Sequence, residues 1–326
     1  MHIVVLAGGI GGARFLVGVR AYARAVGAEV TAVVNVGDDL RLHGLKVCPD
    51  LDSVMYTLGG GADPDRGWGR VAETWTVKSE LAAYGAEPTW FGLGDRDIAT
   101  HLVRTTMLDA GYPLHAVTEA LAARWQPGVR VLPATDDRLE THAVVSGAGH
   151  DVDAPPTATA EQRAIHFQEW WVRYRARIDT HRFVFVGADT ATPAPGVLEA
   201  VGSADVVLVA PSNPVVSIAP VLAVPGLRQA IVEAPGRVVG ISPIIGGAPI
   251  RGMADRCLEV LGVECSAAGV GRLYGSRRTG GLLDGWLVAE EDAATVVPEV
   301  TVRAAPLRMT DEAATTAMVR AALELT

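Results

Sequence analysis

The chain has 326 residues, of which 49% are hydrophobic and 20% are charged. These proportions are ordinary for a globular protein and too apolar for a disordered chain. The formal net charge of -9 argues against non-specific binding to nucleic acid. An acidic chain can still bind phosphate groups when a metal ion or backbone N–H groups supply local positive potential.

The three cysteines form neither a CxxC pair nor a disulfide framework, which favours a reducing compartment. The apolar run at 3–7 has no basic region before it and soon meets glycines, so we expect no secretory signal. The most apolar stretch, 206–227, is interrupted by four prolines and is not expected to cross a membrane. We therefore expect a cytoplasmic protein without a membrane partner.

Short, continuous apolar runs alternate with helical patterns along much of the chain. Continuous runs are typical of strands that are buried on both faces of a parallel sheet. We predict helices over 13–26 and 252–261, and strands over 3–7, 30–34, 183–186, 206–210 and 238–241. This alternation indicates βαβ units around an open, mainly parallel α/β sheet that is flanked by helices.

The middle of the chain, 64–180, is richer in Trp, Arg, His and Glu than the rest. Its patterns predict helices over 97–109, 114–125 and 160–177, and the small polar segment 146–159 is typical of a surface loop. We interpret 64–180 as a mostly helical insertion into a core that is formed by 1–63 and 181–326.

Four glycines follow the first predicted strand within five residues. Their lack of a Cβ allows a tight turn and a close approach to a ligand, and the next helix offers free N–H groups to a phosphate. Arg14 breaks the GxGxxG dinucleotide pattern, and no Walker A lysine follows. A plain strand–helix turn is the alternative, but we favour phosphate or nucleotide binding by Gly8, Gly9, Gly11 and Gly12.

Acidic residues follow the second predicted strand. Asp38 and Asp39 come directly after it, and Asp52 follows in the segment 48–53. Because Mg²⁺ commonly takes one or two carboxylates together with substrate phosphates, Asp38 and Asp52 are candidate metal ligands and catalytic residues. The alternatives are a helix cap at Asp52 and a turn at Asp38.

Three further segments combine polar groups that suit a binding site. Asp97 and His101 in the segment 94–101 have the i,i+4 spacing of a local helix pair, which is the alternative to a binding role. The segment 166–177 mixes aromatic and basic side chains, although tryptophans at helical spacing are more often core. Ser212 and Asn213 follow a strand between two prolines, where either a structural turn or a phosphate contact is expected.

Together these segments resemble the 2-phospho-lactate or phosphoenolpyruvate transferase family of deazaflavin coenzyme F-420 biosynthesis. The segments 63–70, 124–128 and 166–175 resemble its actinobacterial branch, which is associated with the phosphoenolpyruvate-derived donor. The matching motifs are GGIGGARF at 8–15, NVGDD at 35–39, CPDLDS at 48–53, GLGDRDIATH at 92–101, LPATDD at 132–137, HFQEWWVRYR at 166–175, APSNPVVSI at 210–218 and SPIIGGAPIRGMA at 242–254.

The resemblance implies a Rossmann-like core, a homodimer and Mg²⁺ as cofactor. It implies a guanosine-diphosphate-linked donor, the deazaflavin precursor Fo as acceptor, and GMP and a deazaflavin phosphodiester as products. The metal-site acids match Asp38 and Asp52, and the archaeal lysine near residue 92 is absent. We expect nucleotide contacts from Ser212 and Asn213 and acceptor contacts from Asp52, Asp95, His166 and Trp170.

Two other functions compete with this transferase. A related family with a similar glycine-rich start suggests a non-catalytic regulator that binds nucleotide sugars, but such a sensor does not need the acid pair of 50–52. A nicotinamide dehydrogenase is weakened by Arg14, which stands at the third glycine position of its fingerprint.

Overall fold

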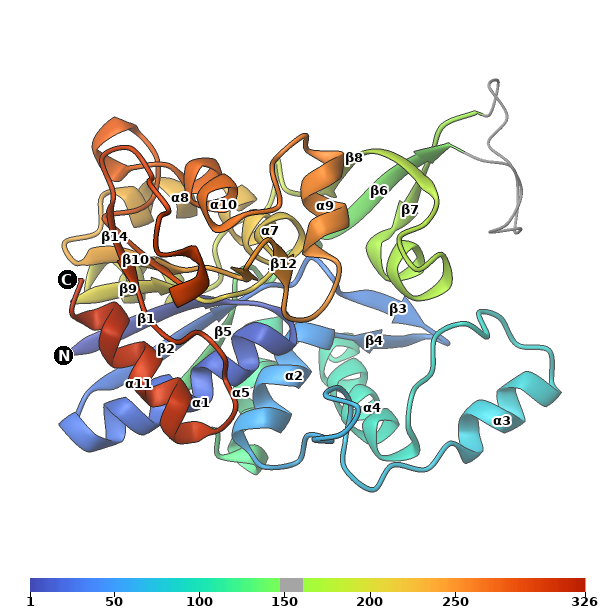
Figure 1. The fold of residues 1–326 in the computed structure, drawn as a ribbon. Coiled ribbons are helices and arrows are strands. Elements are labelled where there is room, and N and C mark those ends of the chain that lie inside the picture. The colour runs from blue at the N-terminus through green and yellow to red at the C-terminus, as the bar shows by residue number, and fades with distance from the viewer. Residues whose placement is uncertain (147–160, 326) are drawn as a thin grey trace.

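The computed structural model describes residues 1–146 and 161–325, so the loop predicted over 146–159 lies outside the described residues except for Ser146. A seven-stranded parallel sheet runs through the body of the protein in the order β14-β13-β10-β9-β1-β2-β5 (Figure 1). The predicted α/β class with a mainly parallel sheet is confirmed. The strands are β1 (His2–Ala7), β2 (Glu29–Val34), β5 (Arg130–Pro133), β9 (Val206–Val209), β10 (Arg237–Ile241), β13 (Gly285–Val288) and β14 (Thr301–Ala304).

Helices cover both faces of this sheet, which explains why β1, β2, β9 and β10 are almost entirely buried. On one face lie α1 (Gly9–Val26), α2 (Pro49–Leu58), α5 (Leu114–Trp125) and α11 (Glu312–Leu323) (Figure 1). On the other lie α7 (Ala219–Ala223), α8 (Leu227–Val232) and α10 (Ala267–Tyr274). Of the predicted strands, 3–7, 30–34, 206–210 and 238–241 are confirmed in the central sheet.

The order of the strands reverses at β1. Strand β1 pairs with β2 on one side and with β9 on the other, and all three run in the same direction. After β1 the chain continues to β2 on one side of the sheet, and after β9 it continues to β10 on the other side. In open α/β sheets, ligands bind in the crevice that forms at such a reversal.

The region 64–180 contains α3 (Thr76–Ala83) and the predicted helices α4 (Asp95–Asp109) and α5. It is less helical than expected, because β5 joins the central sheet beside β2. It also contributes to a three-stranded antiparallel sheet in the order β7-β6-β8, formed by β7 (Arg163–His166), β6 (Glu140–Ser146) and β8 (Asp179–Val186). The division into core and insertion at residues 64 and 180 stays a prediction.

Two predicted elements are wrong. The described part of 160–177 is not one helix but β7 followed by the π-helix η1 (Glu169–Arg173), because residues 163–166 pair with β6. The run 183–186 belongs to β8, which is antiparallel to β6 and half exposed, rather than to the buried parallel sheet. A four-residue apolar run carries too little pattern to separate these two kinds of strand.

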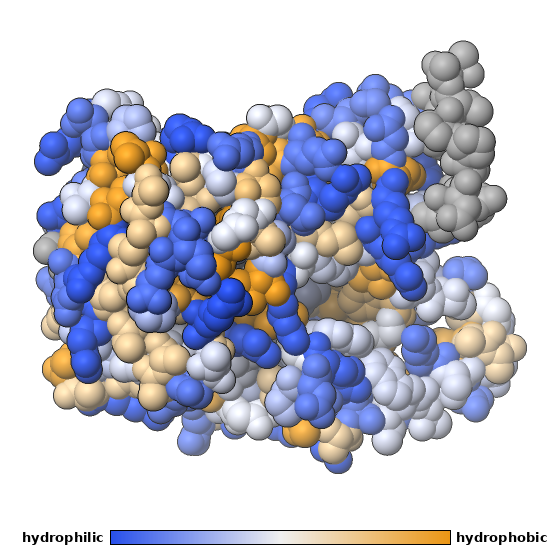
Figure 2. All heavy atoms as spheres, viewed as in Figure 1, coloured by the Kyte–Doolittle hydropathy of each residue, from blue (hydrophilic) through white to orange (hydrophobic). Residues whose placement is uncertain are grey.

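Short elements at the two edges of the sheet complete the fold. They are β3 (Leu40–Leu42), β4 (Leu45–Val47), α6 (Val197–Gly202), η2 (Pro214–Ile218), β11 (Ile244–Ile245), β12 (Ala248–Pro249), α9 (Ala254–Val260), η3 (Arg277–Thr279) and η4 (Glu290–Asp292). In the same view, Figure 2 shows the surface hollowed between the upper right part, with α9 and β6, and the lower right part, with α3 and α4. None of the helices in 1–146 and 161–325 has the length and apolar character needed to cross a membrane.

Candidate active site

The glycine-rich segment and the loop after β9 meet at the strand reversal. The N–H of Gly8 donates to Ser212 Oγ at 3.2 Å, and Ser212 Oγ donates to the Gly8 carbonyl at 2.7 Å. A Cβ at Gly11 would lie 2.7 Å from the Pro211 carbonyl oxygen, and one at Gly12 would lie 2.8 Å from Ser212 Oγ. Glycine at 11 and 12 is therefore needed to pack α1 against this loop, whatever ligand binds nearby.

The amino end of α1 suits an anion. The helix begins at Gly9 rather than at residue 13, and no side chain caps it. Gly9 has a φ of +62°, which favours glycine, and a Cβ there would have only Ser217 Oγ nearby, at 3.7 Å. First-turn N–H groups and the helix dipole attract negative charge. Phosphate binding by Gly8, Gly9, Gly11 and Gly12 stays a prediction that this geometry supports.

Ser212 and Asn213, the predicted nucleotide contacts, already hold the local backbone. Ser212 is buried and bonded to Gly8. The side-chain oxygen of Asn213 accepts from the N–H groups of Val215, at 2.9 Å, and Val216, at 3.3 Å, and so caps η2. Their nucleotide contacts stay predictions, and the turn that the sequence left open as the alternative is formed.

Two buried carboxylates lie close to these loops. Asn35, after β2, donates from its amide nitrogen to Asp50 Oδ2 at 2.8 Å and to Asp38 Oδ1 at 3.4 Å. Gln168, after β7, donates to the other oxygen of Asp38 at 3.1 Å. The Asn35 amide is oriented by the Gly37 N–H, which donates to its oxygen at 2.8 Å. Three segments that are distant in sequence thus meet around one acidic centre.

The charges of this centre are only partly compensated. Burial, Asp50 and Asp39 hold the pKa of Asp38 well above its usual range, and burial raises the pKa of Asp50 to about 6. Asp39 contacts Lys46 Nζ at 3.1 Å and Cys48 Sγ at 3.0 Å. The other oxygen of Asp39 is buried and has no hydrogen-bond partner within the described ranges. Lys46 thus offsets the charge of Asp39 alone, and the carboxylate oxygens of this centre form a donor set that fits Mg²⁺.

Asp52 does not share this centre. Arg104 of α4 donates to Asp52 Oδ2 at 3.1 Å from one terminal nitrogen and to Oδ1 from the other. His101 Nδ1 lies 3.7 Å from Asp52 Oδ2, and His101 Nε2 lies 3.4 Å from Asp97 Oδ2. Asp52, Asp97 and His101 are close enough to hold a metal ion, but Arg104 already supplies their positive charge. Asp38 therefore shares the Asn35 amide with Asp50, and the predicted metal role of Asp38 and Asp52 stays a prediction.

Two of the predicted acceptor contacts have other partners. Asp95 accepts from Thr74 Oγ1 at 2.7 Å and from the N–H groups of Thr76 and Val77 at 3.0 Å. The Thr74 hydroxyl and these N–H groups lower the pKa of Asp95 to about 2, so it works as a charged cap of α3. Trp170 is 1% exposed and donates from its indole to Thr180 Oγ1 at 2.7 Å. Trp170 therefore packs in the core, which is the alternative that the sequence left open, and the acceptor contacts of Asp95 and Trp170 stay predictions.

His166 is placed at the acidic centre. Its Nδ1 accepts from the Gln168 N–H at 3.1 Å, and its Nε2 lies 3.1 Å from the Asp39 carbonyl oxygen. A carbonyl only accepts, so Nε2 carries the proton and the ring is neutral. Burial lowers the pKa of His166, which agrees with this state. The acceptor contact of His166 stays a prediction.

Five residues of the site were not predicted from the sequence: Asn35, Asp50, Lys46, Arg104 and Gln168. Asn35, Asp50 and Gln168 stand inside motifs that carry the family resemblance, so a signal was present, but only the fold shows that they converge. A Cβ at Gly92, near which the family resemblance expects a lysine, would lie 3.0 Å from Lys78 Nζ of α3.

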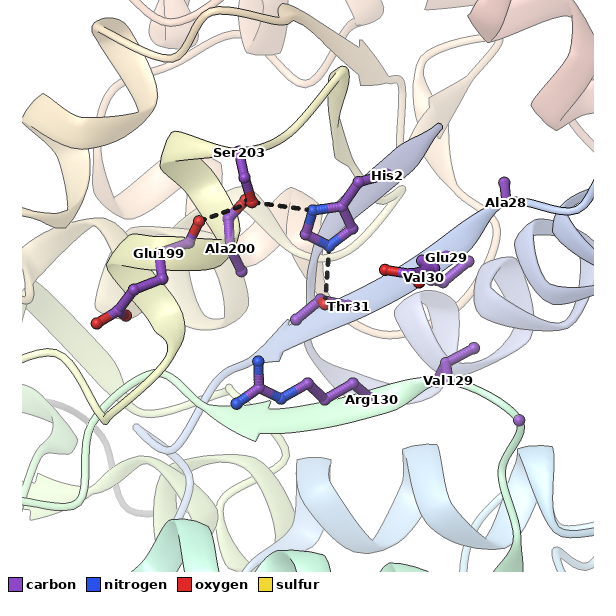
Figure 3. Close-up of a pocket in the computed structure, with 11 residues that line it drawn as sticks. His2, Ala28, Glu29, Val30, Thr31, Val129, Arg130, Glu199, Ala200 and Ser203 are labelled. Carbon is purple, nitrogen blue, oxygen red and sulfur yellow. Dashed lines mark hydrogen bonds between the residues drawn. The ribbon is translucent and has the colours of Figure 1, made fainter.

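A second cavity, of about 700 Å³, lies at the opposite edge of the sheet (Figure 3). Its lining includes His2, Thr31 and Arg130, at the amino ends of β1, β2 and β5. His2 Nδ1 lies 3.2 Å from Ser203 Oγ and His2 Nε2 lies 3.0 Å from Thr31 Oγ1, so both ring nitrogens are engaged. Since ligands of open α/β sheets bind at the carboxyl ends, the acidic centre is the stronger candidate.

Comparison with known proteins identifies the family of the chain. The model of the family described as 2-phospho-L-lactate transferase CofD matches residues 3–323. Proteins named phosphoenolpyruvate transferase from Nocardia farcinica and Streptomyces griseus are each 61% identical, over 99% and 100% of this chain and 94% and 98% of their own. One of the same name from Mycolicibacterium smegmatis is 60% identical over 100% of this chain and 98% of its own.

Solved structures agree on the fold. Two structures of a Bacillus halodurans protein, one of them described as a member of the upf0052 family, align with TM-scores of 0.62 and 0.60. The identity is 18%, and the alignments cover 98% and 99% of both chains. The family match favours a transferase over the regulator and the dehydrogenase that the sequence left open. The chain belongs to the 2-phospho-L-lactate transferase CofD family, and it is a transferase.

Proposed function

We propose that the protein transfers an enolpyruvyl-phosphate group, or a lactyl-phosphate group, from a guanosine-diphosphate-linked donor to the ribityl hydroxyl of the deazaflavin precursor Fo. GMP is the second product, and the reaction belongs to coenzyme F-420 biosynthesis. The supporting observation is the meeting of the α1 amino end, the Ser212 loop and the Asp38–Asp50 centre at the strand reversal. The names of the relatives that are about 60% identical favour the enolpyruvyl donor.

Each group of the centre has a role in this proposal. The amino end of α1 and the Gly8–Gly12 backbone bind the diphosphate. Asp38 and Asp50 hold Mg²⁺, which when bound offsets the charge of the phosphate oxygens. This assignment replaces the pair Asp38 and Asp52, because Arg104 already neutralises Asp52.

In the reaction, the hydroxyl oxygen of Fo forms a bond to the phosphorus that bears the enolpyruvyl group. The bond from that phosphorus to the oxygen of GMP breaks, and the hydroxyl proton leaves to a base. The protein forms no covalent intermediate in this scheme, so positioning and electrostatics carry the catalysis. Asn35 and Gln168 fix the carboxylates that hold the metal.

We further propose that the enzyme works as a homodimer in the cytoplasm. The family resemblance supports the dimer. The three free cysteines fit a reducing compartment.

The test is a coupled assay with Fo, donor generated in situ and Mg²⁺, in which chromatography follows GMP and the deazaflavin phosphodiester. We expect both products with Mg²⁺ and neither with EDTA. Asp38→Asn and Asp50→Asn should each lower kcat by about 100-fold or more, as expected when a group that stabilises transition-state charge is lost. Asp189→Asn, at an exposed position, is the matched control.

Two results would contradict the proposal. Absence of product from folded protein with every component present would exclude this reaction. Turnover that needs Mg²⁺ but survives both substitutions would move the metal away from Asp38 and Asp50.

A further inference from the structure

Arg14 and Arg251 come together beside the amino end of α1 without an acidic partner. Arg14 lies in the second turn of α1 and is half-buried, and Arg251 is exposed between β12 and α9. Burial and the nearby charge of Arg251 lower the pKa of Arg14. Throughout 1–146 and 161–325, neither guanidinium makes a salt bridge or hydrogen bond. Two like charges thus lie close enough to interact in a protein whose net charge is -9.

The backbone is shaped to place Arg251 there. Gly67, in the segment after α2, has a φ of +75°, and a side chain at this position would occupy the space of the Arg251 guanidinium. Gly252 has a φ of +80°, and a Cβ there would lie 3.3 Å from the Trp171 ring. Glycines at 67 and 252 therefore let the Arg251 loop pass between the segment after α2 and η1.

An open cavity of about 440 Å³ adjoins this pair. Its lining includes Ile10 and Arg14 of α1, Thr57 of α2 and Gly67. Asp63 also lines it, but its carboxylate is held by Arg66 Nη2 at 2.8 Å and so does not neutralise the pair. Because Ile10 belongs to the glycine-rich segment, the cavity continues from the proposed diphosphate site.

We propose that Arg14 and Arg251 together bind an oxyanion of the donor, either the diphosphate or the carboxylate of the transferred group. This inference rests on the proposed function, since it names the donor of that same site. Guanidinium groups bind carboxylate and phosphate oxygens through paired, charge-assisted hydrogen bonds. An oxyanion between the two arginines would also remove the repulsion that the pair has in its absence.

The experiment measures two quantities on Arg14→Gln, Arg251→Gln and Arg251→Lys. Calorimetry gives the Kd of GDP, which has a diphosphate but no carboxylate, and the coupled assay gives the KM of the enolpyruvyl donor. If the arginines hold the diphosphate, both Gln variants bind GDP about tenfold more weakly or worse, which is the effect of one lost charge-assisted contact. If they hold the carboxylate, GDP binding is unchanged and the donor KM rises by about tenfold. Arg251→Lys should recover part of either loss, because it keeps the charge but not the planar fork.

Arg256→Gln is the matched control, because Arg256 is exposed on α9 five positions away and pairs with Glu259. If Arg256→Gln weakens GDP binding or raises the donor KM by the same factor, the effect comes from the net charge of the protein, and the proposal is overturned. Unchanged Kd and KM in both Gln variants would also overturn it, while wild-type turnover would leave the proposed function standing. A wild-type protein that neither binds GDP nor turns over would refute the proposed function and this inference with it.

Discussion

Arg104 of α4 donates hydrogen bonds from both of its terminal nitrogens to the carboxylate of Asp52 in α2. Both side chains are buried, and His101 Nδ1 lies 3.7 Å from the same carboxylate. This ion pair ties α4 to the first turn of α2, two residues after Asp50. Asp52 therefore holds the helix that presents Asp50 to Asp38, which gives it a positioning role.

Removal of the positive partner tests this role. Arg104→Met leaves the Asp52 charge buried and unpaired, so we expect the free energy of unfolding to fall by about 3–5 kcal/mol. Urea denaturation at neutral pH measures the change. The double variant Asp52→Leu/Arg104→Met should recover most of the loss, because it buries no charge. A single variant as stable as the wild type would show that the pair is not buried in solution.

The Asp38–Asp50 centre should weaken the protein when no metal is bound. Burial raises the pKa of Asp50 to about 6 from the ordinary aspartate pKa of about 3.9, which corresponds to about 3 kcal/mol of unfavourable interaction for the charged form. We therefore expect Asp50→Asn to raise the free energy of unfolding in EDTA at pH 7.5, by up to that amount. Denaturation of both proteins in EDTA measures it, and a destabilised variant would contradict the prediction. In the variant, Mg²⁺ should no longer add stability.

The raised pKa of Asp50 also predicts how the free energy of unfolding depends on pH. Between about pH 4 and pH 6 the folded protein keeps a proton on Asp50 that the unfolded chain releases, so this group makes stability fall as pH rises. Asp38, whose pKa is held well above its usual range by burial and by Asp50, acts in the same direction. Protons compete with a metal for these carboxylates. Mg²⁺ should therefore raise Tm little at pH 5 and clearly at pH 7.5.

A scan with Mg²⁺ and with EDTA across this range measures the effect. The control is Asp38→Asn/Asp50→Asn, in which the difference between Mg²⁺ and EDTA should vanish at every pH. A Tm increase that is the same at pH 5 and pH 7.5 would place the metal on groups other than these carboxylates.

The sequence predicts the parts of this site that local patterns encode. The apolar run of β1, the glycines after it and the position of Asp38 at the end of β2 all follow from chain order and parallel topology. Local patterns do not show whether Asp50 or Asp52 lies beside Asp38. Residues two apart on a helix point to different sides, so only the packing of α2 decides which acid faces β2, and Arg104 of α4 takes the other.

The segment 160–177 shows a different limit. Its spacing of apolar residues suits a helix, but His166 pairs in register with His142 of β6. The next turn is a π-helix, with Trp170 packed 5.2 Å from the Phe183 ring. Cross-strand pairing and aromatic packing override local propensity here. Neither the partner strand nor the packed ring is visible from local spacing.

Substitutions of Trp170 and the adjacent Trp171 test whether Trp170 has a structural role or a binding role. Trp170→Ala removes a buried indole and its hydrogen bond to Thr180, so the free energy of unfolding should fall by about 3–5 kcal/mol. Trp171 is partly exposed, and Trp171→Ala should cost about 1–2 kcal/mol. Urea denaturation compares the two variants. At a temperature where Trp170→Ala is folded, its KM for Fo should stay within about twofold of the wild type, because a core residue does not touch the acceptor. A variant that keeps its stability but has a KM for Fo raised by about tenfold would instead place Trp170 in the acceptor pocket, as the sequence predicted.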